Sequence, residues 1–299
     1  MVNFAYILMF MKESIHEDLN MRAWERHGKD MINDSYFYDF RSNIYGGQMP
    51  VEFQRMFLAG DGNELVAKAC AVHSSSMLGY NFFHWIKEYP LTIRWSDRKE
   101  VTYNQVCFEE KMPVLVGTTP ANMDIVLRNQ NGDVLFIESK FLEYTNSNKF
   151  KLSATYNEPR KYYIKGVQWG HLISSIDTKL PTQYWEGIVQ EIRHLIAITN
   201  WIEGKTDVGG YWYQGIGDVR FINLVFEPKE VYSEHSAFLA YKERYSELHA
   251  KLEENNLVPS ALKMEFMTYS ELWKIVRDMD NLPKPLKDYL DSHYMVFAK

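Results

Sequence analysis

The amino-acid sequence predicts a mixed α/β fold, and three observations support this prediction. Short apolar runs rich in β-branched residues lie near the centre of the chain, at Met123–Leu127 and Val134–Ile137. The clearest helical pattern follows later, over residues 180–203, and a further apolar strand follows at 219–226. The expected order is therefore a helix, a three-strand meander, a second helix, a fourth strand and a helical tail.

Composition limits the classes of function. The 299 residues carry 33 Lys and Arg against 39 Asp and Glu, a net charge of −6, and 46% of the residues are hydrophobic. This balance excludes wholesale disorder and a generally basic nucleic-acid-binding coat. A nucleic-acid partner would have to meet a local basic patch or metal ions that offset the acidic groups. The longest apolar run is too short to span a membrane, so we expect a cytoplasmic protein with no membrane partner.

The chain is expected to form one domain over residues 1–299. Residues 1–59 would be an N-terminal extension of helical pieces and loops, residues 60–230 the core, and residues 231–299 a helical C-terminal extension. The first core helix is predicted to begin at Asp61 and to place Leu65, Ala69 and Val72 on one face. Residues 142–179 are expected to form a long polar loop.

Three strands are predicted at residues 103–110, 122–128 and 134–141, and a hairpin turn at Asn129–Asp133 joins the second to the third. A three-residue loop would place Gly132 at the position that requires a left-handed backbone. The same register, carried back along the hairpin, puts Asp124 directly opposite Glu138. Opposed residues share one face of a sheet, with Cβ atoms ~4.5–5.5 Å apart.

This predicted pair of carboxylates indicates a metal site. Carboxylates that lie so close repel each other, so either one pKa rises or a cation lies between them. Oxygen ligands of this kind suit Mg²⁺, which takes one or two carboxylates together with substrate phosphate. Mn²⁺ is expected to substitute for Mg²⁺. Lys140 shares a face with Glu138 and would lie beside an attacking water.

The spacing of Asp124 and Glu138-Ser139-Lys140 across a hairpin resembles the PD-(D/E)XK nuclease superfamily, which has the restriction-endonuclease-like fold. The core of that fold is a helix, a three-strand meander, a second helix and a fourth strand, the order expected here. The resemblance covers roughly residues 60–227, and its upstream part is similar to uncharacterised bacterial restriction-endonuclease-like proteins. One departure is that Met123, not Pro, precedes Asp124.

The resemblance implies a role for each matching residue. Asp124, Glu138 and the backbone carbonyl of Ser139 would bind the metal, and Lys140 would orient the attacking water. Glu64 would be a further metal ligand or would contact the side chains that bind the metal. Gln190, on the second core helix, would contact the site. The implied activity is hydrolysis of phosphodiester bonds by an endonuclease of restriction type.

DNA is the expected substrate, and a homodimer would match a palindromic target. Residues 140–165 hold six Lys and Arg against two Glu, a net charge of +4 directly after the third strand. Such a stretch could follow a phosphate backbone. The substrate-binding residues expected from it are Lys149, Lys151, Arg160 and Lys161.

Other interpretations of the same residues remain open. Asp124, Glu138 and Lys140 could be a structural ion-pair cluster, which would leave a non-catalytic nucleic-acid-binding or assembly protein. Paired carboxylates also serve glycosidases, although the adjacent Lys140 would hold both acids ionised and argues against that class. Glu64 could instead bond back to the start of its helix. Glu109 and Glu110 are expected on the first strand, where one of them could approach the site, although a solvated position is the more common outcome.

Overall fold

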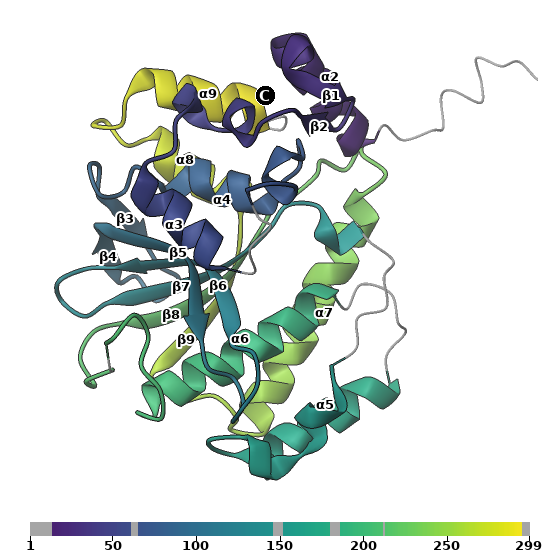
Figure 1. Ribbon diagram of the computed structural model, residues 1–299. Helices are drawn as coiled ribbons and strands as arrows, with labels where there is room; N and C mark the ends of the chain where they lie inside the picture. The colour runs from purple at the N-terminus through teal and green to yellow at the C-terminus, as the bar shows by residue number, and fades with distance from the viewer. Residues whose placement is uncertain (1–13, 61–64, 146–151, 180–185, 212, 295–299) are drawn as a thin grey trace, which may run out of the picture.

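The computed structural model describes residues 14–60, 65–145, 152–179, 186–211 and 213–294 (Figure 1). Its centre is a five-stranded mixed sheet in which the strands lie in chain order. The strands of this sheet are β5 (Gln105–Met112), β6 (Ala121–Arg128), β7 (Val134–Lys140), β8 (Val219–Val225) and β9 (Leu262–Thr268). The first three are antiparallel, and β8 and β9 continue the sheet in parallel with β7.

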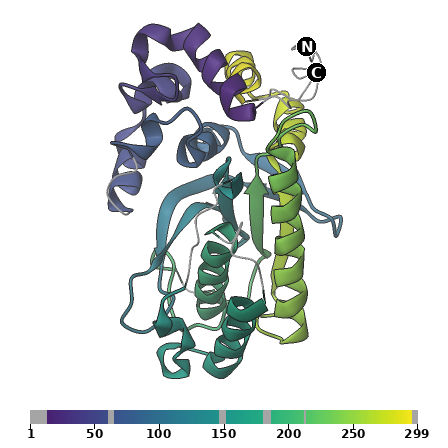
Figure 2. The ribbon, with the colours of Figure 1, turned by 90° about the vertical axis from the view of Figure 1, so that its right-hand side faces the viewer.

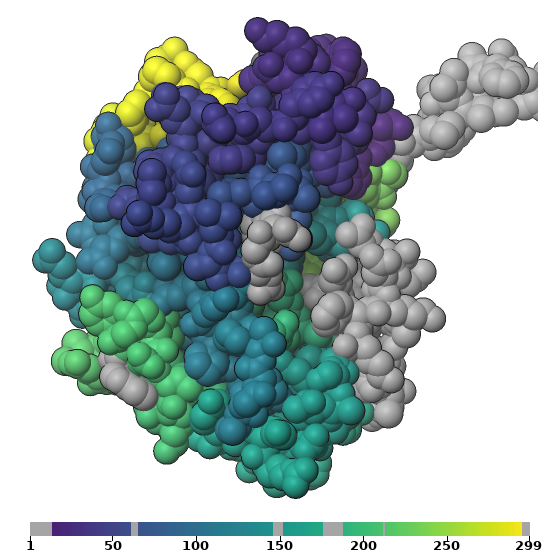
Figure 3. Space-filling model, in the orientation of Figure 1, coloured from purple at the N-terminus to yellow at the C-terminus, as the bar shows by residue number. Residues whose placement is uncertain are grey.

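Helices surround the sheet. They are α2 (Ile15–His27), α3 (Val51–Ala59), α4 (Ser75–Phe83), α5 (Gly166–Lys179), α6 (Glu186–Ile202), α7 (His235–Glu254), α8 (Tyr269–Arg277) and α9 (Lys284–Tyr294). Two small hairpins complete the described fold, β1–β2 (Met31–Asn33 and Tyr36–Phe37) and β3–β4 (Leu91–Arg94 and Glu100–Tyr103). Figure 3 shows the N-terminal segments covering the upper part of the molecule, and Figure 2 shows α7 running beside the sheet. Among the described helices, none is both long and apolar enough to cross a membrane.

The hairpin register agrees with the sequence prediction. Residues 125–128 pair with residues 137–134, and Gly132 has a φ of +85°. β7 is buried along its whole length, as a strand between two others must be when helices cover both faces. Ile125 and Ser139 face α4, whereas Glu138 and Lys140 face α6. The alternation of side chains therefore places the predicted carboxylates and the lysine on the α6 side of the sheet.

The first core helix lies later in the chain than the sequence pattern predicted. Residues 65–72 form turns and a short 3₁₀ helix, Lys68–Cys70, and the helix that packs on the sheet is α4. The Ser74 side chain accepts a hydrogen bond from the Met77 N–H and caps this helix. The run of three serines, Ser74 to Ser76, therefore forms the helix start. Gly79 lets α4 approach closely, because a Cβ there would lie 2.8 Å from Cδ1 of Ile125.

Two further predictions of local structure are wrong. The expected loop over residues 142–179 contains α5, whose Trp169, Leu172 and Ile173 are buried on one face. The C-terminal extension is not purely helical, because β9 joins the central sheet beside β8. The residues between the two buried ends of β9 are only partly buried, so its sequence mixes polar and apolar residues and lacks the continuous apolar run of an interior strand. The other predicted elements, the three-strand meander, α6 and β8, are present.

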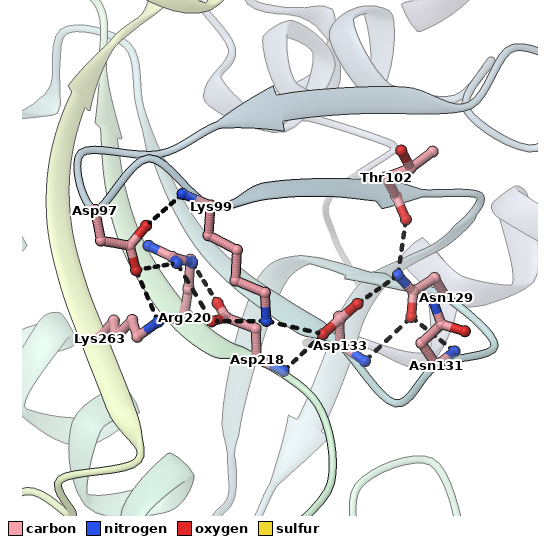
Figure 4. Close-up of polar contacts among 9 residues, drawn as sticks. All are labelled: Asp97, Lys99, Thr102, Asn129, Asn131, Asp133, Asp218, Arg220 and Lys263. Carbon is pink, nitrogen blue, oxygen red and sulfur yellow. Dashed lines mark hydrogen bonds and ion pairs between the residues drawn. The ribbon is translucent and has the colours of Figure 1, made fainter.

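A buried ion cluster ties the β3–β4 hairpin to the sheet (Figure 4). The Arg220 side chain is fully buried and contacts Asp97 from the hairpin turn, Asp218 two residues before it, and Glu265 on β9. Its guanidinium also lies 4.6 Å from the ring centroid of Trp95. Arg220 is the second residue of β8, so this cluster lies at the end of the sheet opposite to Lys140.

Candidate active site

A cavity of about 380 Å³ opens where β6 begins and β7 ends. One wall comes from the segment that leads into α4, and the other comes from α6. The residues that line it are Tyr36, Lys68, Ala71, His73, Ser74, Ser75, Ser76, Glu109, Pro120, Asn122, Asp124, Lys140, Glu143, Gln190, Arg193 and His194. Segments distant in the sequence thus meet around Asp124 and Lys140.

Asp124 and Glu138 are brought together by the hairpin register. Asp124 lies one residue beyond the last pair of the ladder, Ile125 with Ile137, on the side away from the turn. Its Oδ2 accepts a hydrogen bond of 2.8 Å from the backbone N–H of Ser139. Asp124 is partly exposed to the cavity, whereas Glu138 is completely buried beneath it. Of the two carboxylates, Asp124 is therefore accessible from the cavity and Glu138 is enclosed by protein.

Glu138 lies between two nitrogen atoms. Lys140 Nζ forms an ion pair with its Oε1, and Nδ1 of His194 lies 2.7 Å from its Oε2. The Lys140 ammonium also donates a hydrogen bond of 2.7 Å to Oε1 of Gln190. Gln190 and His194 lie one turn apart on α6, so a single helix face fixes both partners of Glu138.

The electrostatics of the group differ between its two carboxyls. Burial raises the pKa of Asp124 well above its ordinary value, and the neighbouring Glu138 raises it further. Burial also disfavours the charged form of Glu138, but Lys140 and His194 outweigh it and lower the pKa of Glu138 to about 2. Burial works against the Lys140 ammonium, and Glu138 and Asp124 reverse that effect and raise its pKa. Glu138 and Lys140 are therefore charged, and Asp124 is the carboxyl that a cation would help to ionise.

The donor set fits a divalent cation that prefers oxygen. Neither oxygen of Glu138 has a well-aligned hydrogen-bond donor among the described residues, although both are in ion-pair contact. The Ser139 carbonyl lies on the same strand edge as the N–H that bonds Asp124. No set of three or more His, Cys, Asp and Glu suited to a metal occurs in the described ranges. Two carboxylates and a carbonyl, completed by water and phosphate, suit Mg²⁺ and not structural zinc.

The charge of the cavity wall leads to the same expectation. When Asp124 is ionised, as it must be to bind a cation, three cationic and three anionic side chains line it, Lys68, Lys140 and Arg193 against Glu109, Asp124 and Glu143. A wall with balanced charge attracts a phosphate weakly. One bound divalent cation would make the cavity positive and favour a phosphate group.

Two predicted substrate-binding residues lie away from the cavity, and three predicted residues cannot be compared with it. Glu64, Lys149 and Lys151 fall outside the described residues. Arg160 has a side chain 84% exposed and pairs with Glu158. The carbonyl of Lys161 accepts a 2.7 Å hydrogen bond from the Val116 N–H. Neither Arg160 nor Lys161 is among the residues that line the cavity, and its cations come from other parts of the chain.

Of the two first-strand glutamates, Glu109 is the one that lines the cavity. Its backbone has a φ of +53°, its side chain lines the cavity, and only 9% of the residue is exposed. The flanking pairs, Phe108 with Ile125 and Glu110 with Met123, place Glu109 opposite Asp124. The register argument that found Glu138 could have found Glu109, had it been extended from β6 to β5. A solvated position for Glu109 is therefore wrong.

Comparison with known proteins adds one finding. No curated protein and no solved structure matches the chain. A protein family described as Restriction Endonuclease associating with ARP matches residues 39–295, which include the whole cavity wall apart from Tyr36. Because the match spans most of the sequence, the chain belongs to the family of restriction endonucleases associating with ARP.

Proposed function

We propose that this protein is a Mg²⁺-dependent nuclease that hydrolyses phosphodiester bonds in DNA, with a site of the PD-(D/E)XK type on a restriction-endonuclease-like fold. The observation that carries the proposal is the convergence of Asp124, Glu138 and Lys140 at the end of the β6–β7 hairpin. These are the residue types that hydrolysis of a phosphodiester needs, because it requires both a cation and an activated water. Membership of a restriction-endonuclease family supports the same activity.

The metal would be held by Asp124, Glu138 and the Ser139 carbonyl. When bound, Mg²⁺ supplies Lewis-acid polarisation of the phosphate and an activated nucleophile. The hydrogen bond from the Ser139 N–H fixes one oxygen of Asp124 and leaves the other available. His194 restrains Glu138 from the opposite side, so both carboxylates are oriented before any substrate arrives.

Lys140 would act on the water and on the phosphate. Lys140 is 5% exposed and lines the cavity, and its ammonium lies between Glu138 and Gln190. A charged group held in place there can orient the attacking water and offset the charge that grows on the phosphate. Gln190 accepts a hydrogen bond from the ammonium, which restrains the directions of the other two N–H groups.

A nuclease assay tests the proposal. Double-stranded plasmid and single-stranded circular DNA are each incubated with the protein and Mg²⁺, with Mn²⁺, or with EDTA, and the same reactions are run with Asp124→Asn and Lys140→Met. Each substitution is expected to lower the cleavage rate by about 10²- to 10⁴-fold. Lys111→Ala, an exposed change on β5 away from the cavity, is the matched control and should cut like the wild type. Equal cleavage by all four proteins would contradict the assignment.

One observation favours a second candidate function. Glu138 is already in contact with Lys140 and His194 in this arrangement, which a purely structural ion cluster would also show. The protein would then bind nucleic acid, or assemble with a partner, without cutting it. Salt-dependent DNA binding with no cleavage in Mg²⁺ or Mn²⁺ would favour this second candidate over the nuclease.

A further inference from the structure

The wall of the cavity opposite α6 is the start of α4. Ser74 caps this helix, and Ser75 and Ser76 form its first turn beside the cavity. The first N–H groups of a helix lack partners within the helix, and its dipole favours an anion at that end. Lys68 lies in the same wall and adds a cation. This wall therefore offers donors and positive charge to a phosphate other than the one at Asp124.

Tyr36 extends this wall outward. It belongs to the small β1–β2 hairpin, bridges to Ala71, and is 43% exposed while lining the cavity. An exposed tyrosine beside a phosphate-binding wall is a platform on which a base can stack. Its neighbour Tyr38 is 68% exposed and does not line the cavity. The hairpin thus carries one tyrosine at the site and one away from it.

Polar atoms on both sides of the cavity lack partners. Oδ1 of Asn122, Nε of Arg193 and Nδ1 of His73 are buried and have no hydrogen-bond partner among the described residues. Unpaired buried polar atoms are uncommon, because each costs the free energy of a lost hydrogen bond with water. All three atoms belong to residues that line the cavity.

The size and depth of the cavity limit what can enter. Its volume of about 380 Å³ lies at the lower end of the ~300–1,000 Å³ range of small-molecule sites. Lys140 is 5% exposed and Glu138 is fully buried. A phosphate must therefore enter the space between α6 and the start of α4 to reach them. A paired duplex is too wide and stiff to enter such a space. One strand, with its bases splayed out, can enter.

We propose that the cavity accepts a single unpaired DNA strand. The start of α4 and Lys68 hold the phosphate next to the scissile one, and Tyr36 stacks on the adjoining base. Single strands are bound in this way elsewhere, by cationic grooves combined with aromatic platforms. The inference rests on the proposed nuclease function for the identity of the scissile phosphate, and it adds the substrate class.

Binding and cleavage are measured separately. A short fluorescein-labelled oligonucleotide and its blunt duplex of the same sequence are titrated with the full chain in Ca²⁺, and both are then tested for cleavage in Mg²⁺. The wild type is expected to bind and cut the single strand in preference to the duplex. Tyr36→Ala should weaken single-strand binding by roughly 5- to 150-fold, the range of one base–aromatic stack.

Matched variants separate stacking from folding. Tyr36→Phe keeps the ring and should bind like the wild type, and so should Tyr38→Ala on the same hairpin. Lys68→Gln should lower the slope of log K against log salt by about 0.7, the effect of one lost phosphate contact on a single strand. Circular dichroism of each variant checks that the fold is kept.

The outcomes distinguish this inference from the function on which it rests. Preference for the duplex, or equal losses in Tyr36→Ala and Tyr38→Ala, would overturn the single-strand proposal and leave the nuclease intact. A wild type that cuts neither substrate would overturn the nuclease proposal. The strand preference measured in Ca²⁺ would still support or reject the binding mode.

Discussion

Nδ1 of His194 lies 2.7 Å from Oε2 of Glu138, and both side chains are almost completely buried. The histidine comes from α6 and the carboxylate from the end of β7, so the contact joins a helix to the sheet at the candidate metal site. A histidine that contacts a carboxylate on the side away from the metal position keeps the remaining lone pairs of that carboxylate directed at the cavity. His194 is therefore a positioning residue, which acts through Glu138.

Loss of this contact should weaken metal binding. His194→Phe is expected to lower the affinity for Mn²⁺ by about 10- to 100-fold, as changes behind metal ligands usually do. Titration calorimetry with Mn²⁺ alone measures the change without reference to cleavage. His171→Phe, an exposed change on α5, is the control. Unchanged Mn²⁺ affinity in His194→Phe would show that Glu138 does not depend on this contact.

Glu138 and Lys140 should be coupled in stability. Removing one partner leaves the other charge buried, so Glu138→Leu and Lys140→Met should each lower the free energy of unfolding by about 3–5 kcal/mol. The double variant removes both charges and should be less destabilised than the sum of the two, by about 1–3 kcal/mol. Urea unfolding of the four proteins measures this coupling. Additive losses would mean that the two groups do not stabilise each other.

Arg220 should be the most sensitive charged residue at the other end of the sheet. Arg220→Met leaves Asp218, which is 3% exposed, without its buried partner and releases Asp97 of the β3–β4 turn. We expect a loss of about 3–5 kcal/mol in urea unfolding, because one partner of a buried pair is removed. Arg244→Met breaks a more exposed pair with Glu247 and should cost at most about 1 kcal/mol. Similar losses in both variants would argue against the structural role of the Arg220 cluster.

His73 should make the protein sensitive to mild acid. Burial, reinforced by the neighbouring His16, lowers the pKa of His73 from 6.5 to about 4. The folded state then binds fewer protons than the unfolded state in this window. The resulting stability is present above about pH 6.5 and is lost as the pH falls toward 4.

Urea unfolding of the wild type and of His73→Asn at several pH values checks this dependence. The variant should lose less stability than the wild type as the pH falls through the window. His171→Asn, an exposed histidine, should behave like the wild type. A pH dependence unchanged by the substitution at His73 would assign the acid sensitivity to other groups.

The parts of the fold that the sequence predicted depend on local signals. Gly132 and the turn around it fix the hairpin, and the apolar runs on each side fix its two strands, so the register followed from short-range chemistry alone. α6 was predictable for the same reason, because its apolar stripe repeats along one continuous segment. The pairing of Asp124 with the end of β7 needed no information beyond these elements.

Other elements were missed because long-range contacts decide them. α4 is buried on all sides against the sheet and the N-terminal segments, so it shows no amphipathic pattern. β9 is a strand because β8 offers it a parallel edge, and its mixed sequence alone does not indicate this. The approach of α6 to β7, which brings Gln190 and His194 to Glu138, likewise depends on tertiary packing.

Local sequence signals alone place Asp124, Glu138 and Lys140 on a single face, because one hairpin register fixes all three positions. The tertiary structure decided their accessibility and their partners. It buried Glu138 against His194 of α6 and closed the cavity with the start of α4. These contacts join segments far apart in the chain. They arise only when the helices bury their apolar faces on the sheet, and periodicity within one segment carries no record of that packing.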